Sequence, residues 1–358
     1  MLLARIRRDV VVLWIQYAVS NLDFLCENIH FLCDIIQHME MDVLSSALAK
    51  LKLKTYVSGV TDVGGKWAVS FPAYEGFKLQ VILKGECWIE LGESKTRHCL
   101  RAGDCSLMTR GQAFVMATDL TAKIQTYAEV MEEYAKKGTL TQGGGGDLLL
   151  IGVHLQFEGH LPKIMFGDLP PLIHIEEHME QAAILRWTIE RFRAEFRGQQ
   201  TGRSLMLSHL APIMLLQILR IYLASTKTER NWLSSLSDPR LSKAIEAIHF
   251  EYHNALSLDD LAQIAGMSRS GFALNFKKHV GIPPMDYLTN WRMDIACELL
   301  ESRTHSVGEV AFAVGYESES AFSFAFNRVI GCRPGFYQKS RCGLQATALT
   351  GTYPTSLE

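Results

Sequence analysis

The chain has 358 residues, of which 48% are apolar and 21% are charged, and its formal net charge is −2. This composition is that of an ordinary globular protein, and the length predicts two or three domains. No uninterrupted apolar run approaches the ~18–20 residues that a membrane helix needs, so we expect a cytoplasmic protein without a membrane partner. The eight cysteines form no CxxC pair. Their scatter favours reduced thiols over a disulfide framework or a zinc site.

Residues 1–41 precede the first convincing domain start. Three arginines stand before the apolar run 10–15, a pattern faintly like that of a signal peptide, but the run is short and no small-residue cleavage site follows it. We interpret residues 1–41 as an N-terminal extension or as the product of a misplaced start codon.

Residues 42–175 are predicted to form a sheet-rich domain, with strands from about residue 55. The segments "LQVILKGECWIEL" and "DLLLIGVHLQF" are rich in β-branched and aromatic residues, and turn signals stand at Gly103-Asp104 and Arg110-Gly111. The glycine run 143–146 is not followed by Gly-Lys-Ser/Thr, so it predicts a flexible hairpin connection rather than a phosphate-binding loop.

Residues 176–225 switch to a helical period and predict an antiparallel helical hairpin. Apolar positions mark a first helix at Ile184, Trp187, Phe192 and Phe196, and a second at Leu207, Leu210, Met214, Ile218 and Ile221. These apolar positions form a stripe along the hairpin. The stripe packs either on the N-terminal sheet or against the same stripe of a second copy of the chain, and the second alternative predicts a homodimer. Residues 226–238 are predicted to be a polar linker. Asp238-Pro239 then gives a strong helix start, with a capping carboxylate followed by proline at the first helical position.

The C-terminal part contains an internal repeat. Leu258, Leu261, Ala262 and Ala265 have the helical spacing i, i+3, i+4, i+7, and the same spacing returns 49 residues later at Val307, Val310, Ala311 and Val314. A glycine follows each short helix. Beyond this glycine, corresponding residues of the two copies are 50 positions apart instead of 49. Serines, phenylalanines, a glycine, a proline and a tyrosine then match in order, from Ser268 with Ser318 to Tyr287 with Tyr337. So many ordered matches indicate two copies of one unit.

Each copy has the features of a helix-turn-helix. Small alanines allow the two helices to approach closely, and Ser268 and Ser318 are predicted N-caps of the second helix. Phenylalanines one turn apart face the core, which leaves the opposite face of that helix available for a major groove. Between the copies, a helical period runs from Tyr287 to Leu299, and this helix is predicted to hold the two units near one DNA turn apart.

These C-terminal residues resemble the DNA-binding domain of AraC/XylS-type transcriptional regulators. The likeness is carried by "LSLDDLAQIAGMSRSGFALNFKKHVGIPPMDYLTNWRMDIACELL" and "SVGEVAFAVGYESESAFSFAFNRVIGCRPGFY". More loosely, "FKLQVILKGECWIEL", "AGDCSLMTRGQAF" and "DLPPLIHI" are similar to the cupin-like sensor domain of one AraC subgroup. The resemblance implies an α+β chain: a cupin-like β-barrel (42–175) with a helical hairpin (176–225), then an all-α domain (239–341) with two helix-turn-helix units and a tail (342–358).

The expected function is therefore sequence-specific DNA binding in transcription regulation, as an activator or a repressor. The expected partners are double-stranded DNA, an unknown small-molecule effector, a second copy of the chain and RNA polymerase. The residues predicted to contact DNA are Arg269, Ser270, Ala273, Leu274, Lys277, Lys278, Arg292, Ser318, Ser320, Ser323, Phe324, Asn327 and Arg328.

The predicted DNA-binding domain departs from the family in its charge and in the middle of its recognition helices. Residues 239–341 hold eleven Lys or Arg and eleven Asp or Glu, so phosphate attraction should be weak. Where the family usually carries arginine, this chain has Leu274 and Phe324. These apolar residues either contact thymine methyl groups or represent lost contacts, and we favour altered specificity.

The N-terminal domain departs from enzymatic cupins, which bind a metal with His and Glu from two motifs. Here the first motif offers Lys78 and the second offers Phe114, so we expect no metal, no other cofactor and no enzyme activity. A barrel of this size can still hold one small ligand. The candidate effector-binding residues are Trp67, Phe71, Trp88, Met108 and Phe114, which could equally be filling the barrel. Two alternatives remain open: a metal-dependent cupin enzyme fused to a helical module, and a degenerate regulator that acts only through protein partners.

Overall fold

The computed structural model describes residues 42–92, 95–137, 141–179, 182–198, 200–225 and 231–340. The chain divides into two units, Met1–Ser46 and Ala47–Glu358, and the second contains nearly all of the described residues. The predicted N-terminal extension 1–41 and the predicted tail 342–358 both lie outside the described residues.

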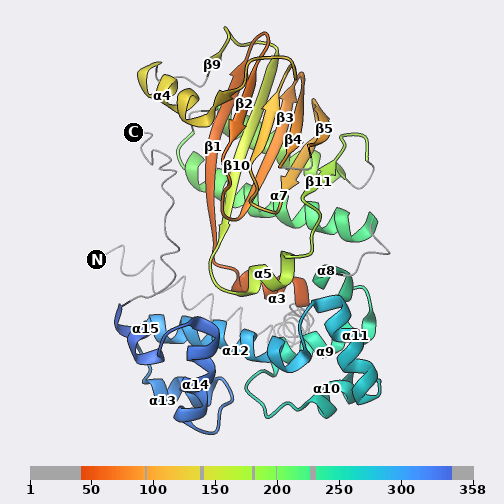
Figure 1. The fold of residues 1–358 in the computed structure, drawn as a ribbon, viewed down its shortest axis with the longest axis vertical. Helices are drawn as coiled ribbons and strands as arrows, with labels where there is room; N and C mark the ends of the chain where they lie inside the picture. The colour runs from red at the N-terminus through yellow and green to blue at the C-terminus, as the bar shows by residue number, and fades with distance from the viewer. Residues whose placement is uncertain are drawn as a thin grey trace, which may run out of the picture. The chain divides into compact units, whose positions relative to one another are not determined.

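Two β-sheets face each other in the N-terminal half (Figure 1). The first sheet has the order β11-β6-β3-β10-β1-β9, and the second has the order β5-β4-β7-β2-β8. The strands of the first are Leu172–Ile175 (β11), Cys105–Met108 (β6), Phe77–Lys84 (β3), Leu148–Phe157 (β10), Leu53–Val63 (β1) and Thr141–Gln142 (β9). Those of the second are Thr96–Arg101 (β5), Glu86–Leu91 (β4), Phe114–Ala117 (β7), Ala68–Phe71 (β2) and Gln125–Thr126 (β8). Buried residues of both sheets, among them Ile82, Leu150, Val69 and Ile89, form one apolar core between them.

The segment "LQVILKGECWIEL" forms β3 and β4 with a turn at Gly85, as its alternating pattern predicts. Gly85 has a φ of +77°, and a Cβ there would lie 2.1 Å from the carbonyl oxygen of Asp147, so only glycine fits. In β4, Cys87 and Ile89 are buried between the sheets whereas Trp88 is only half-buried. Because successive strand residues face opposite sides, Trp88 lies on the outer face and is not a cavity residue.

Two helices interrupt the region that was predicted from strand patterns, namely α4 (Tyr127–Lys137) and α5 (Leu161–Phe166). A third helix, α3 (Val43–Lys50), precedes that region. In α4 the apolar residues Tyr127, Val130 and Met131 recur at i, i+3 and i+4 and turn toward the barrel. The prediction of strands throughout 55–175 is therefore wrong for residues 127–137 and 161–166, and the short helical period of the first segment was overlooked.

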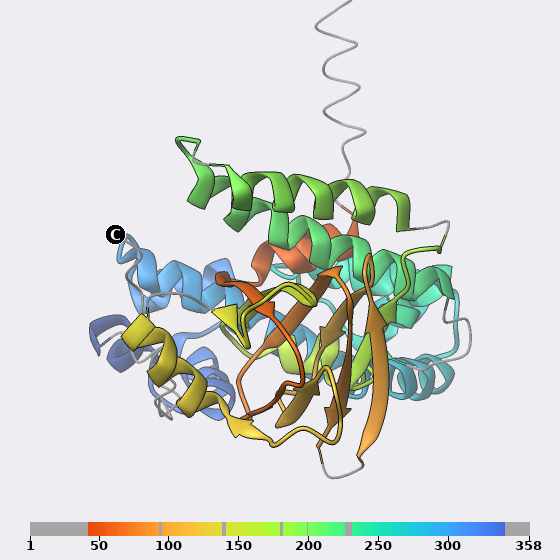
Figure 2. The same cartoon turned by 90° about the horizontal axis from the view of Figure 1, so that it is seen from above.

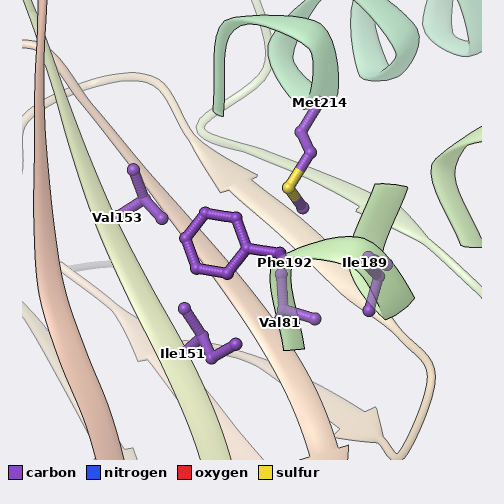
Figure 3. Close-up of a pocket in the computed structure, with 6 residues that line it drawn as sticks. All are labelled: Val81, Ile151, Val153, Ile189, Phe192 and Met214. Atoms are coloured by element: carbon purple, nitrogen blue, oxygen red, sulfur yellow. The ribbon is translucent and has the colours of Figure 1, made fainter. Parts of the chain in front are cut away.

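The helical hairpin consists of α6 (Ala183–Arg197) and α7 (Arg203–Ser225), and it covers one face of the six-stranded sheet (Figure 2). Phe192 and Met214 point to Ile151 and Val153 of β10, with almost no space left between them (Figure 3). The apolar stripe of the hairpin thus packs on the N-terminal sheet, which was the first of the two alternatives. Ile184 and Trp187 lie outside that contact and are 54% and 59% exposed.

Helix α7 is 23 residues long and apolar enough, by length and composition, to cross a membrane. Its buried residues include Leu210, Met214 and Ile218, and the helix packs on α6 and β1. Contacts within the protein therefore bury one side of this helix, whereas Leu205, Met206 and Ile213 are 64%, 44% and 40% exposed.

The C-terminal part is helical, as predicted. Its helices are α8 (Trp232–Ser235), α9 (Pro239–Phe250), α10 (Leu258–Ile264), α11 (Arg269–Val280), α12 (Pro284–Ser302), α13 (Val307–Ala313), α14 (Glu319–Ile330) and α15 (Pro334–Ser340). Asp238 caps α9 through the backbone N–H of Arg240 at 3.0 Å. The predicted polar linker 226–238 is not a simple linker, because Trp232 and Leu233 of α8 are buried. Residues 226–230 lie outside the described part of the chain.

Candidate nucleic-acid interface

The two helix-turn-helix units are capped in the same way. In each unit the first helix begins with a capping box, formed by Ser257 with Asp260 and by Ser306 with Glu309. The second helix begins at Ser268 or Ser318, and each Ser Oγ accepts a hydrogen bond at 3.3 Å from the backbone N–H three residues later. The predicted N-caps are thus confirmed, and they fix where each recognition helix starts.

The aromatic cores of the two units are also equivalent. The rings of Phe272 and Phe276 are 5.5 Å apart, and so are those of Phe322 and Phe326. A tyrosine then packs on the second phenylalanine of each pair: Tyr287 at 5.7 Å in the first unit, and its counterpart Tyr337 at 5.5 Å in the second. The repeat seen in the sequence is therefore a repeat of packing, and each recognition helix is held by the same contacts.

Helix α12 joins the two units (Figure 1). Near its start Tyr287 packs on α11, and near its end Glu301 accepts a hydrogen bond at 2.7 Å from the hydroxyl of Tyr337 in α15. The helix also contacts α13 and α14. Because α12 is a rigid element of 19 residues, it fixes the separation and the orientation of the two recognition helices.

The middle of each recognition helix presents a large apolar side chain to solvent. Leu274 is 74% exposed and Phe324 is 75% exposed. They occupy equivalent positions, six residues after the N-caps, between phenylalanines that are fully buried. The prediction that these two side chains point away from the core is confirmed. No described residue of the domain covers them, so they are available to a partner.

Exposed polar and basic residues surround these two side chains. In α11, Arg269, Ser270, Lys277 and Lys278 are exposed and Ala273 is half-buried. In α14, Ser320, Asn327 and Arg328 are exposed, and Ser318 and Ser323 are half-buried. With the offset of 50, Lys277 and Lys278 correspond to Asn327 and Arg328. The first unit thus carries more positive charge, although Arg269 also forms a surface ion pair with Asp259 at 3.1 Å.

Arg292, a predicted DNA contact, is half-buried and is bound by backbone groups of the protein itself. Its guanidinium donates hydrogen bonds to the carbonyl oxygens of Tyr252 at 2.7 Å and Asn254 at 2.8 Å, and it stacks on the ring of Tyr316. These contacts tie the segment after α9 to α12 and to the second unit. We therefore assign Arg292 a structural role and leave it out of the proposed DNA contacts.

A buried hydrogen-bond network anchors the start of α12. The indole Nε1–H of Trp232 donates to the hydroxyl oxygen of Tyr287 at 2.9 Å, and that hydroxyl lies 2.8 Å from Nε2 of His249. Burial lowers the pKa of His249 to about 3, so its imidazole is neutral and Nε2 can accept a hydrogen bond from the tyrosine hydroxyl. One hydroxyl group thus joins α8, α9 and α12.

Tyr287→Phe should lower the free energy of unfolding by about 1–3 kcal/mol, because it leaves the indole N–H and the imidazole nitrogen buried without a partner. Denaturant unfolding of the full chain measures the change. Tyr252→Phe is the matched control, since Tyr252 is only half-buried, and it should change little. Equal stability of Tyr287→Phe and the unmodified chain would show that the network does not stabilise this helix.

Of the five candidate effector-binding residues, two line a cavity in the barrel. These are Trp67 and Phe71, whose neighbours in the lining include Lys78, Gln80 and Tyr127. Phe114 lies behind Phe71, with the two rings stacked 4.6 Å apart, and Met108 is part of the buried core. Trp88 faces outward. The sequence reasoning thus overlooked Lys78 as a lining residue, although it had placed that lysine at the first metal motif of enzymatic cupins.

Across the described ranges, no three His, Cys, Asp or Glu side chains gather in a way that could hold a metal ion. His154, on β10, is 3% exposed and its Nε2 makes a hydrogen bond with the carbonyl oxygen of Glu75. This histidine is thus held by the backbone of the protein.

Two capped and equivalent helix-turn-helix units define a DNA-binding protein of the helix-turn-helix class. Comparison with known families agrees: a cupin family matches residues 42–224, and a helix-turn-helix domain family matches residues 261–340. An AraC-like transcription regulator of Streptomyces antibioticus is 33% identical over 300 residues, covering 84% of this chain and 99% of the relative. The HTH-type transcriptional regulator AlkR of Acinetobacter baylyi is 28% identical, covering 84% and 99%. The chain belongs to the AraC-type transcriptional regulators with an N-terminal cupin domain.

Among solved structures, the chain is similar to the DNA-binding domain of AdpA, described as a global transcriptional factor in complex with a target DNA. That domain is 33% identical, and the match covers 28% of this chain and 90% of the domain with a TM-score of 0.27.

Proposed function

We propose that this regulator recognises a specific duplex sequence with both recognition helices, α11 and α14, in successive major-groove segments. The observation that supports the proposal is the equivalence of the two units, including the exposed residues Leu274 and Phe324 at the same position in each. A helical repeat that served only to build a core would not need a large apolar side chain in water at both places.

Selection of binding sites from random duplex DNA by the purified full chain tests this proposal. The selected sites should contain two conserved blocks about one helical turn apart, which is ~10 base pairs. Thymine-containing steps are expected in both blocks, because an apolar side chain can pack on the thymine methyl group. A library that remains random after selection would contradict sequence-specific binding.

We further propose that a small molecule in the cupin barrel modulates this DNA binding. The cavity lined by Trp67 and Phe71 supports the proposal, because its volume of about 80 Å³ exceeds the ~10–15 Å³ that one water needs. Contacts between α12 and the N-terminal domain offer a route by which effector binding would reach the DNA-binding domain. Lys50 forms an ion pair with Glu298 at 2.8 Å, and Asp294 accepts hydrogen bonds from the backbone N–H groups of His160 and Leu161.

We infer that the chain acts as a regulator rather than an enzyme, and that it works in the cytoplasm. The names of its relatives support both inferences, since the matching proteins are transcriptional regulators. No arrangement of described residues favours the alternative of a metal-dependent cupin enzyme.

We also propose a homodimer built on the helical hairpin. Most of the hairpin's apolar stripe packs on the sheet, but Ile184 and Trp187 lie one turn apart on α6 and face solvent. Full-length protein at micromolar concentration should therefore sediment as a dimer, and Trp187→Glu should sediment as a monomer. Ile124→Glu, at an equally exposed position outside the hairpin, should stay dimeric. A monomer for the unmodified chain, or a dimer for Trp187→Glu, would exclude this interface.

A further inference from the structure

A cavity of about 80 Å³ lies inside the cupin barrel, between the two sheets and α4. Most of its lining is apolar, with Val69 and Met116 from the five-stranded sheet, Leu150 from β10, and Val130 from α4. Of the polar side chains in this lining, three are more than nine-tenths buried, namely Trp67, Lys78 and Gln80, whereas Thr61 and Tyr127 are half-buried. A buried polar group is costly unless it has a partner, so these three residues identify the chemistry that the cavity accepts.

Lys78 places a positive charge in this cavity without a counter-ion. Its Nζ lies 4.5 Å from the ring centre of Tyr74, 5.1 Å from that of Phe114 and 5.3 Å from that of Phe71. These rings hold the ammonium in place by cation–π contact. Among the described residues, none forms a hydrogen bond or an ion pair with it. Burial alone lowers the pKa of Lys78 to about 8, so the side chain is still mostly protonated at pH 7.

Two further groups in the lining have no hydrogen-bond partner in the part of the chain that the structure describes. They are Nε1–H of Trp67, which can only donate, and Oε1 of Gln80, which can only accept. Both atoms are buried, and both residues line the same cavity as Lys78. A ligand that satisfies them carries an acceptor near the indole, a donor near the amide oxygen and a negative charge near the ammonium.

We propose that the cavity binds a small organic acid, with its carboxylate on Lys78 and Trp67 and its apolar body against the aliphatic lining. The apolar lining favours such an acid over an inorganic anion, which could not use that surface. A hydroxyl or N–H group on the acid would satisfy Gln80. This inference rests on the proposed effector role of the barrel and names the class of the effector.

The binding test uses full-length protein, isothermal titration calorimetry, and three probes: benzoate, hexanoate and the neutral benzamide. Benzoate or hexanoate should bind saturably with a dissociation constant below about 1 mM, and benzamide should bind about 10- to 100-fold more weakly than benzoate, because it lacks the charge-assisted hydrogen bond. Lys78→Met should remove the difference between benzoate and benzamide. Lys66→Met removes the same charge from an exposed site outside the lining and should retain the difference.

Thermal unfolding without any acid separates a ligand-binding lysine from a structural one. Lys78→Met should raise the Tm, because it removes a buried charge that lacks a counter-ion. If the aromatic contacts of Lys78 mainly stabilise the barrel, the same substitution lowers the Tm, and the proposal fails. It also fails if neither acid binds at 10 mM, or if benzamide binds as tightly as benzoate, which would indicate a neutral ligand.

Measuring DNA affinity with and without the bound acid distinguishes this proposal from the proposed function. A change in affinity that Lys78→Met abolishes would support both. Saturable binding of the acid with unchanged DNA affinity would leave the acid site in place and overturn its role as the effector site. DNA binding by a protein that takes no acid would overturn the acid site alone.

Discussion

Replacing Lys277 and Lys278 together with alanine should weaken DNA binding about 60-fold at 0.1 M salt. Binding that neutralises phosphates releases counter-ions, so the association constant varies with salt concentration to the power of about −0.9 for each contact. Each phosphate contact then raises the association constant about 8-fold at 0.1 M salt. Loss of two contacts should make the slope of log association constant against log salt concentration shallower by about 1.8. Because phosphates carry no base sequence, the loss should be similar on selected and on random duplexes.

The two lysines supply most of the positive charge near the first recognition helix, and the domain as a whole has equal numbers of acidic and basic residues. Removing them from a neutral domain should therefore matter more than it would in a strongly basic one. Fluorescence anisotropy over a range of salt concentrations measures both affinity and slope. Lys163→Ala with Lys243→Ala is the matched control, because both lysines are exposed and neither lies on a recognition helix. An unchanged salt slope for the Lys277 and Lys278 variant would place the phosphate contacts elsewhere.

Leu274→Arg should change the base that the first unit prefers. An arginine at this exposed position can donate two hydrogen bonds to guanine O6 and N7, whereas leucine can only pack on a thymine methyl group. Such a bidentate contact is worth about 1–3 kcal/mol of discrimination, or roughly 5- to 150-fold between the right and the wrong base. The added charge should also raise affinity for random DNA.

Site selection from random duplexes, carried out in parallel on both proteins, measures this change. The conserved block read by α14 should be the same for both, because Phe324 is untouched, and only one step in the other block should move from thymine to guanine. Leu205→Arg adds the same charge at an exposed position of α7, outside the DNA-binding domain, and should leave both blocks unchanged. Identical preferred sequences for Leu274→Arg and the unmodified chain would mean that Leu274 does not face the bases.

The DNA-binding domain could be predicted from the sequence because its signals are local and occur twice. The caps at Ser268 and Ser318 and the buried phenylalanine pairs lie within one helix each, and every match between the copies supports the others. The exposure of Leu274 and Phe324 follows from the same helical period. Arg292 could not be placed in this way, because its partners, the carbonyl groups of Tyr252 and Asn254, are about 40 residues away in the chain.

The cupin domain was harder to predict because tertiary contacts decide its details. Helix α4 was overlooked since its apolar residues gain a surface to cover only when β2 and β10 are in place beside them. Lys78 lies in the strongly apolar strand β3, and its sequence gives no sign that aromatic rings from Phe71, Tyr74 and Phe114 gather around its ammonium. Alternation in β4, by contrast, could have excluded Trp88 from the cavity at once, because Cys87 and Ile89 on either side are the inward positions.

Hydroxyl-radical footprinting on a selected duplex tests most directly whether both helix-turn-helix units read DNA. The rigid connection through α12 and the equivalent exposed faces of α11 and α14 predict two protected segments, about one helical turn apart on the same face of the duplex. A single protected segment, with the second block of the site left open to cleavage, would contradict the account.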